Sequence, residues 1–193
     1  MIEYALAALL GFAGGAVGGM LGVGGGILFV PALAIILGET QIHAEATSLV
    51  AIVLVAIVGA WRQNRYGNVR LRDGALIGVL SPLGVIIGVL LSNAVSERTL
   101  EVGFAILLIF WFGYGEREAT GTSLAAIVAI GVLGAVGQGL YGNVNLLEGI
   151  LVGVPAVAGV LAGTALQQRV PERTISLLFA LLLVAVAVEL LLG

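Results

Sequence analysis

A cluster of glycines interrupts the first long apolar stretch of the chain, residues 4–37. Gly22, Gly24, Gly25 and Gly26 stand in the middle of this stretch, with apolar residues on both sides. Each glycine costs about 1 kcal/mol relative to alanine inside a helix, so several close together predict that the helix breaks there. Backbone that leaves helical geometry inside a membrane is tolerated only where protein buries it or where it lines a polar cavity. The cluster therefore predicts a broken or re-entrant helix, and it makes the chain a candidate carrier of a small polar solute.

The composition indicates an integral membrane protein. Charged residues make up 10% of the 193 residues, whereas soluble domains carry about 25%. The net charge of −3 gives no support for a nucleic-acid partner, and the absence of cysteine removes disulfides and thiol chemistry. The first residues have no basic n-region, and the apolar run exceeds the length of a signal-peptide core. We therefore expect a retained membrane segment.

The apolar segments predict an all-α, polytopic integral membrane protein of about seven spans, because a helix needs about 20 apolar residues to cross the hydrocarbon. We expect one membrane domain over residues 1–193. The first segment either crosses once or folds into a hairpin, and the sequence does not decide between the two. The segments are 4–37, 44–61, 74–92, 99–114, 119–137, 147–166 and 173–192.

The chain repeats itself at a constant offset of 75 residues. Thr47-Ser48-Leu49 recurs as Thr122-Ser123-Leu124, and Tyr66-Gly67-Asn68-Val69 recurs as Tyr141-Gly142-Asn143-Val144. Internal duplication is typical of transporter folds. The repeat divides the chain into three parts, which are an N-terminal glycine-interrupted segment over 1–43, repeat one over 44–115 and repeat two over 116–193.

Three spans per repeat predict that the two repeats lie in opposite orientations. The connection 62–72 carries four arginines, and its counterpart 137–146 carries none. Since cytoplasmic connections are enriched in arginine and lysine, the two connections are expected on opposite sides of the membrane. The sequence therefore predicts an inverted repeat of three helices in a multi-pass protein of the cell membrane, such as a bacterial or archaeal inner membrane.

The candidate binding site combines main-chain amides with paired hydroxyls. A half-helix that begins near Ile27 would present free N–H groups, which attract anions without a basic side chain. The hydroxyl pairs Thr47-Ser48 and Thr122-Ser123 stand where two predicted spans start, so they are candidates both for substrate contact and for capping free N–H groups. The glycines also match close packing of helices, and the two interpretations are compatible.

Catalysis and metal binding have no supporting pattern. His43 is the only histidine, and His43-Ala44-Glu45 lacks the spacing of a zinc site. Nearly all charges fall at the ends of spans, so the intramembrane carboxylates that proton pumps use are missing. We therefore expect no enzyme activity, no metal and no cofactor.

The run from Gly14-Gly15 through Gly22-Val23-Gly24-Gly25-Gly26 to Pro31 resembles the TauE/SafE sulfite exporter family, and the likeness continues through Ala46-Thr47-Ser48-Leu49. The resemblance covers essentially the whole chain. It implies a permease of two related halves that exports sulfite or another small sulfur-containing or organic anion. The family's second repeat normally opens with its own glycine-rich segment, and here residues 113–121 lead directly into Thr122. A partner chain would supply the missing wall.

These observations predict a secondary transporter, and specifically an exporter, of a small anion such as sulfite or an organosulfonate. The alternatives are a non-transporting scaffold or accessory subunit, and a passive channel. The expected partners are the anion, the lipid bilayer, a coupling proton or cation, and further copies of the chain, with no nucleic acid. Neither the substrate, the coupling ion, the direction of transport nor the oligomeric state follows from the sequence. The predicted site residues are Gly22, Gly24, Gly25, Gly26, Thr47, Ser48, Thr122 and Ser123.

Overall fold

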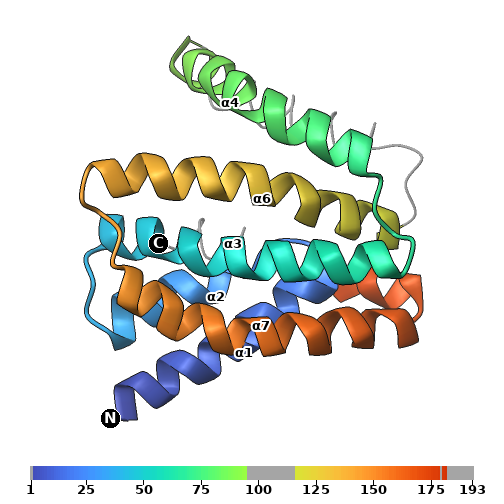
Figure 1. Ribbon diagram of the computed structural model, residues 1–193, viewed down its shortest axis with the longest axis horizontal. Helices are drawn as coiled ribbons and strands as arrows, with labels where there is room; N and C mark the ends of the chain where they lie inside the picture. Colours follow the sequence, from blue (N-terminus) through green and yellow to red (C-terminus); the bar gives the residue numbers. More distant parts are fainter. Residues whose placement is uncertain (1, 95–115, 179, 182–193) are drawn as a thin grey trace.

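The structure, a computed structural model, is built of helices throughout the residues that it describes, which are 2–94, 116–178, 180 and 181 (Figure 1). The side chains of 84–94 and 116 lie outside the described part. Residues 172–178 are also helical. The named elements are α1 (Ile2–Leu21), α2 (Gly26–Pro31), the π-helical η1 (Ala32–Ile36), α3 (Gln41–Arg65), α4 (Leu71–Ala94), α6 (Glu116–Leu140) and α7 (Leu146–Arg169).

Four of the described helices are long and apolar enough to cross a membrane. They are Ile2–Leu21, Gln41–Arg65, Arg117–Leu140 and Leu146–Arg169. This confirms the prediction of an all-helical, multi-pass membrane protein. The predicted span 99–114 lies outside the described residues, and 173–192 is described only in part, so the count of seven spans stays a prediction.

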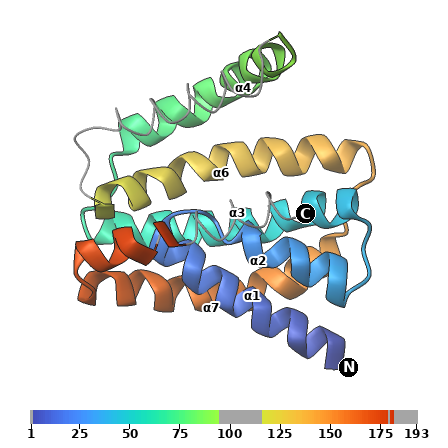
Figure 2. The same cartoon turned by 180° about the vertical axis from the view of Figure 1, so that it is seen from behind.

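The N-terminal stretch breaks at the glycine cluster and folds back as a hairpin (Figure 2). A Cβ on Gly14 would lie 2.5 Å from the Phe29 ring, and one on Gly18 would lie 2.6 Å from the Gly25 nitrogen. Contacts that pair 14 with 29 and 18 with 25 require α2 to run antiparallel to α1. The structure therefore decides in favour of a hairpin over a single continuous helix in residues 4–37.

Glycines also let α1 pack against α7 along its length. Gly11, Gly15 and Gly19 face the α7 backbone, and a Cβ on Gly15 would come within 2.0 Å of the Ala156 carbonyl oxygen. Such close approach is what small residues at four-residue spacing permit between membrane helices. Both interpretations of the glycine-rich segment hold, because its first half packs while its second half unwinds.

Helix α3 lies at the centre of the bundle and contacts α6, α7 and the hairpin. Two contacts in the bundle, one between α4 and α6 and one between α7 and α3, are related by the offset of 75 residues. Gly74 of α4 faces Ala125 of α6, and Gly149 of α7 faces Val50 of α3. Gly74 and Gly149 are 75 positions apart, and so are Val50 and Ala125, so the two contacts join equivalent positions of the two repeats. Each pair thus joins a helix of one repeat to a helix of the other.

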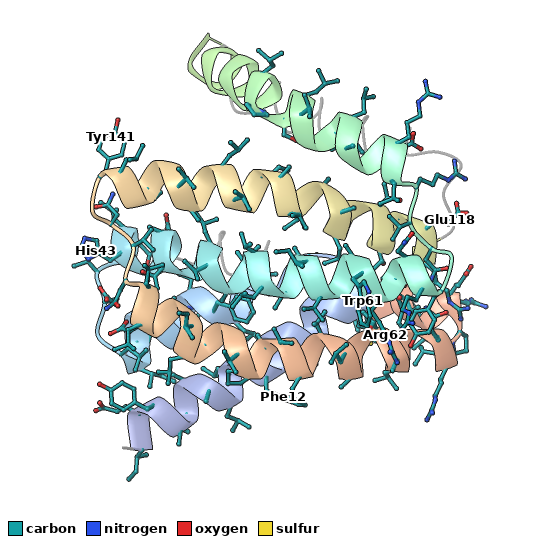
Figure 3. All side chains as sticks on the ribbon, in the orientation of Figure 1. Phe12, His43, Trp61, Arg62, Glu118 and Tyr141 are labelled. Carbon is teal, nitrogen blue, oxygen red and sulfur yellow. The ribbon has the colours of Figure 1, made fainter. Side chains whose placement is uncertain are left out.

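The two ends of the bundle differ in charge (Figure 3). His43 and Tyr141 lie at one end, and Trp61, Arg62 and Glu118 lie at the other. We call the second the arginine end, because it carries every basic residue whose side chain the structure describes apart from His43. These residues are Arg62, Arg65, Arg70, Arg72, Arg117, Arg169 and Arg173. The first is the acidic end, with Glu3, Glu39, Glu45 and Glu148.

Candidate functional site

The glycine break is a left-handed turn that only glycine adopts without strain. Gly22, Gly24 and Gly25 have φ angles of +77°, +78° and +84°. In this region a Cβ clashes with the following carbonyl, which costs roughly 1–2 kcal/mol per residue for other amino acids. Helix α1 therefore ends at Leu21, and α2 starts at Gly26 with Gly25 as its N-cap. The predicted break is confirmed.

Gly24 lies midway between the two ends of the bundle, whereas Gly22 lies nearer the arginine end, against Thr120, the fifth residue of α6. A Cβ on Gly24 would sit 3.2 Å from a methyl of Ile52 and 3.7 Å from a methyl of Ile127. Each isoleucine is the twelfth of 25 residues in its helix, α3 or α6. A helix of that length is about 37 Å long, so Gly24 lies roughly 17 Å from either end.

The break leaves main-chain amides without acceptors. The Gly25 carbonyl accepts hydrogen bonds from the amides of Leu28 at 3.1 Å and Phe29 at 3.2 Å. The amides of Gly24, Gly25 and Gly26 make no hydrogen bond within the described part of the chain. Gly24 and Gly25 are buried. Since more than about nine in ten buried backbone N–H groups are paired in proteins, adjacent unpaired amides are unusual and are suited to an anion.

Side chains of repeat two hold carbonyl groups at and just after the end of α1. The Ser123 hydroxyl of α6 donates to the Gly22 carbonyl at 2.9 Å. The side-chain amide of Gln167 in α7 donates to the Met20 carbonyl at 2.7 Å. The last four carbonyls of a helix lack partners in their own helix, and the Gln167 bond satisfies one of them. Ser123 is the predicted hydroxyl that contacts the glycine cluster directly.

The other three hydroxyls bond elsewhere. Thr47 Oγ1 accepts a hydrogen bond from the backbone N–H of Asn145 at 2.9 Å, and Thr122 Oγ1 accepts one from the backbone N–H of Arg70 at 3.2 Å. Ser48 Oγ donates to the Glu45 carbonyl of its own helix at 2.7 Å. Each threonine thus holds a connection of the other repeat by one hydrogen bond. Arg70 and Asn145 occupy equivalent positions in the two repeats, because they are 75 residues apart.

The prediction that the hydroxyl pairs start their helices is wrong. Helix α3 begins at Gln41 with Thr40 as its N-cap, and α6 begins at Glu116. Thr47 and Thr122 therefore lie almost two turns inside these helices. The error arose because the polar residues before each pair read as a connection, whereas they extend the helices beyond the apolar core.

Two buried glutamines near the break were missed by the sequence analysis. Gln63 and Gln167 are both 0% exposed, and the Gln63 amide donates to the Gln167 carbonyl oxygen. The repeat partner of Gln63 is Gln138, which is exposed. The signal that was available is that glutamine is a costly residue near a membrane span unless its amide is satisfied.

A carboxylate cluster lies at the acidic end. Glu39 Oε1 accepts from the Asn145 side chain at 3.0 Å, and Glu39 Oε2 lies 3.4 Å from His43 Nδ1. The Asn145 hydrogen bond is the main cause that lowers the pKa of Glu39, with smaller contributions from Glu148 and His43, while burial acts in the opposite direction. Glu148 Oε2 is buried and has no hydrogen-bond partner in the described part. The sequence analysis did not foresee this cluster.

Metal binding has no candidate site in the described ranges, where no group of three or more histidine, cysteine or acidic side chains is placed to hold an ion. The described arginines lie at the arginine end, and none of them is among the nearest neighbours that a Cβ on Gly22, Gly24, Gly25 or Gly26 would meet.

Comparison with known proteins points to membrane transporters. A family model described as "Sulfite exporter TauE/SafE" matches residues 7–115 and 105–190. The "Probable membrane transporter protein YunE" of Bacillus subtilis (strain 168) is 27% identical over 115 residues, which are 56% of this chain and 42% of that protein. The "Probable membrane transporter protein YdhB" of the same organism is 27% identical over 155 residues, which are 74% of this chain and 60% of that protein. The chain thus spans about half the length of these relatives. No solved structure matches the chain.

Proposed function

We propose that this chain, which belongs to the TauE/SafE sulfite exporter family, is a secondary transporter of a small anion such as sulfite or an organosulfonate. The observation that carries the proposal is the set of unpaired amides at Gly24, Gly25 and Gly26, at mid-depth of the bundle. Main-chain amides bind oxyanions through directional hydrogen bonds, and apolar surroundings strengthen such bonds. Ile52 and Ile127 form that apolar wall.

The anion would be bound by the glycine amides and by Ser123. The Ser123 hydroxyl already lies against Gly22, so rotation of its side chain turns it toward the break without a change in the backbone. Thr47, Ser48 and Thr122 remain proposed substrate contacts of lower weight, because each is bonded elsewhere in this conformation. Gly22 is the flexible backbone position about which α1 and α2 move relative to each other.

We infer that alternating access comes from rocking one inverted repeat against the other. The contacts of Gly74 with Ala125 and of Gly149 with Val50 support this, since they are exchanged by the repeat offset. The distribution of arginines supports an orientation with the arginine end in the cytoplasm of a cell membrane. In the proposed orientation Ile2 lies on the outer side, and the proposed direction of transport, from the arginine end outward, is export.

The proposal is tested by flux of labelled sulfite in vesicles that contain the purified chain. Ser123→Ala removes the hydroxyl at the break and is expected to raise the apparent KM about tenfold, the usual size for one hydrogen bond to a charged group. Ser81→Ala is the matched control, because the Ser81 hydroxyl donates only to Ile77 of its own helix. Equal flux in wild type and both variants would exclude this site.

The scaffold hypothesis remains the second candidate, because the chain spans about half the length of its relatives. An accessory subunit would carry no flux alone and would gain it only with a partner chain. Saturable sulfite flux by the purified chain would reject the scaffold, and flux that follows an imposed proton gradient would reject the passive channel.

A further inference from the structure

A continuous series of side-chain amides joins four segments next to the glycine break. Asn68 Nδ2 donates to Gln63 Oε1 at 2.8 Å, Gln63 Nε2 donates to Gln167 Oε1, and Gln167 Nε2 donates to the Met20 carbonyl at 2.7 Å. We call these three side chains and the Met20 carbonyl the amide relay. It connects the α3–α4 turn, α3, α7 and the end of α1.

The relay is costly unless it is complete. Gln63 and Gln167 are fully buried, and a buried side-chain amide without hydrogen-bond partners destabilises the fold. Each carbonyl oxygen of the pair accepts one bond and each amide nitrogen donates one. An apolar pair would pack between α3 and α7 without this demand, so the amides require a reason beyond packing.

The relay ends on the carbonyl that precedes the break. Met20 is one residue from the end of α1, and Gly22 follows Leu21 directly. The Gly22 amide closes the last turn of α1 by donating to the Gly18 carbonyl at 2.9 Å. Holding the Met20 carbonyl therefore determines the direction in which the chain enters the unwound segment.

The acidic end contains the first hydrogen bond of such a relay, and no bond that continues it is present among the described residues. Asn143 Nδ2 donates to Gln138 Oε1 at 2.9 Å, as Asn68 does to Gln63. Gln138 is exposed, and the residue that corresponds to Gln167 is Ser92, whose side chain lies outside the described part. The repeat thus supplies both ends with the turn, and among the side chains that the structure describes the relay continues to the break at the arginine end alone.

We propose that Gln167 is a positioning residue of the anion site, which fixes the Met20 carbonyl and thereby the amides of the glycine break, with Gln63 holding Gln167 in place. The proposal rests on the proposed function. It assigns to Gln167 no contact with the anion itself. The effect on transport passes through the backbone between Met20 and Gly26.

The first experiment measures amide hydrogen exchange of the segment 20–22, the hydrogen-bonded end of α1 and the first residue after it, by mass spectrometry and does not depend on transport. Gln167→Met keeps the side-chain volume and removes the donor, and it is expected to speed exchange in this segment about tenfold. Gln138→Met is the matched control at the acidic end, and it is expected to leave the segment unchanged. Equal exchange in the two variants would overturn the proposal.

The second experiment separates positioning from general stability. Gln167→Met is expected to raise the KM for sulfite about tenfold with little change in the maximal rate. The double variant Gln63→Met/Gln167→Met removes both buried amides together, so its unfolding temperature is expected to rise above that of Gln167→Met. The KM should stay raised, because the Met20 carbonyl still lacks its donor. Recovery of the KM together with stability would show a purely structural role.

The two proposals fail in different ways. If the wild-type chain carries no sulfite, the proposed function falls, and the exchange comparison still decides whether Gln167 positions the break. If sulfite is carried and Gln167→Met changes neither the exchange nor the KM, the positioning role alone is overturned.

Discussion

The arginine end and the acidic end begin with the same local structure and finish with different ones. After α3 and after α6, a glycine with φ near +78° terminates the helix, and the next asparagine bonds back to a glutamine. At the arginine end the glutamine, Gln63, is buried against Gln167, whereas at the acidic end Gln138 is exposed. The difference comes from α7 and α1, which cover Gln63 and its bonding partners.

The contrast shows that the repeated sequence specifies the turn, whereas the helices that pack on it decide whether its glutamine is buried. The hairpin packs along α7 of repeat two, so the break lies asymmetrically against a pair of otherwise related repeats. The described residues contain one glycine break, and the amide relay beside it lies at the arginine end.

The largest expected effect tests the one-sided packing of the hairpin. Gly15→Ala places a Cβ 2.0 Å from the Ala156 carbonyl oxygen, and two helix backbones must separate to admit it. We expect a loss of about 3 kcal/mol or more, because overpacking against backbone cannot be relieved by a rotamer change. The measurement is the unfolding temperature in detergent micelles. Gly137→Ala, with no described atom within 4 Å, is the control and should stabilise by about 0.5–1 kcal/mol.

The second prediction compares the two turns directly. Asn68→Ala leaves the buried Gln63 carbonyl oxygen without its donor, so we expect a loss of about 1–3 kcal/mol. Asn143→Ala removes the equivalent donor to Gln138 Oε1, but that oxygen is exposed and water replaces the hydrogen bond. We therefore expect a loss of only about a few tenths of a kcal/mol in the free energy of unfolding. Paired thermal unfolding curves measure both. Equal losses would contradict the difference in burial on which the comparison depends.

The third prediction concerns contacts that the two ends share. Thr47→Val and Thr122→Val each remove the acceptor of one connecting amide, at Asn145 and Arg70 respectively. Because the two bonds are related by the repeat, we expect similar losses of about 1 kcal/mol each. Urea or thermal unfolding of the single variants checks this. A loss confined to one variant would show that the related contacts are not energetically equivalent.

The smallest expected effect is at the acidic end and depends on pH. The pKa of Glu39 is lowered in the folded chain, chiefly by the Asn145 hydrogen bond, so its ionised form stabilises the fold above the usual glutamate pKa. That stabilisation is lost as the pH falls through the lowered pKa. His43 and Glu148 are the titratable groups that face Glu39. We expect the unfolding temperature of the wild type to fall more steeply on acidification than that of Glu39→Gln. Parallel curves for the two proteins would rule out this contribution.

Much of the fold follows from local sequence. Apolar length predicts α3, α6 and α7, and the clustered glycines predict the break, because a left-handed φ is a property of single residues. The offset of 75 residues predicts which contacts recur. The amide pairing could not be predicted, since Gln63 and Gln138 occupy the same motif and differ only in what packs on them.

By itself, the sequence determined that this is a helical membrane protein of the TauE/SafE family with an interrupted first segment, because hydropathy and glycine content act over short distances along the chain. Only the tertiary structure decided that the segment folds back, that Ser123 rather than Thr47 meets it, and that Gln167 holds its entrance. The physical reason is sequence separation. Ser123 and Gln167 lie 101 and 147 residues from their acceptors, and the packing of α1 against α6 and α7 alone brings them together.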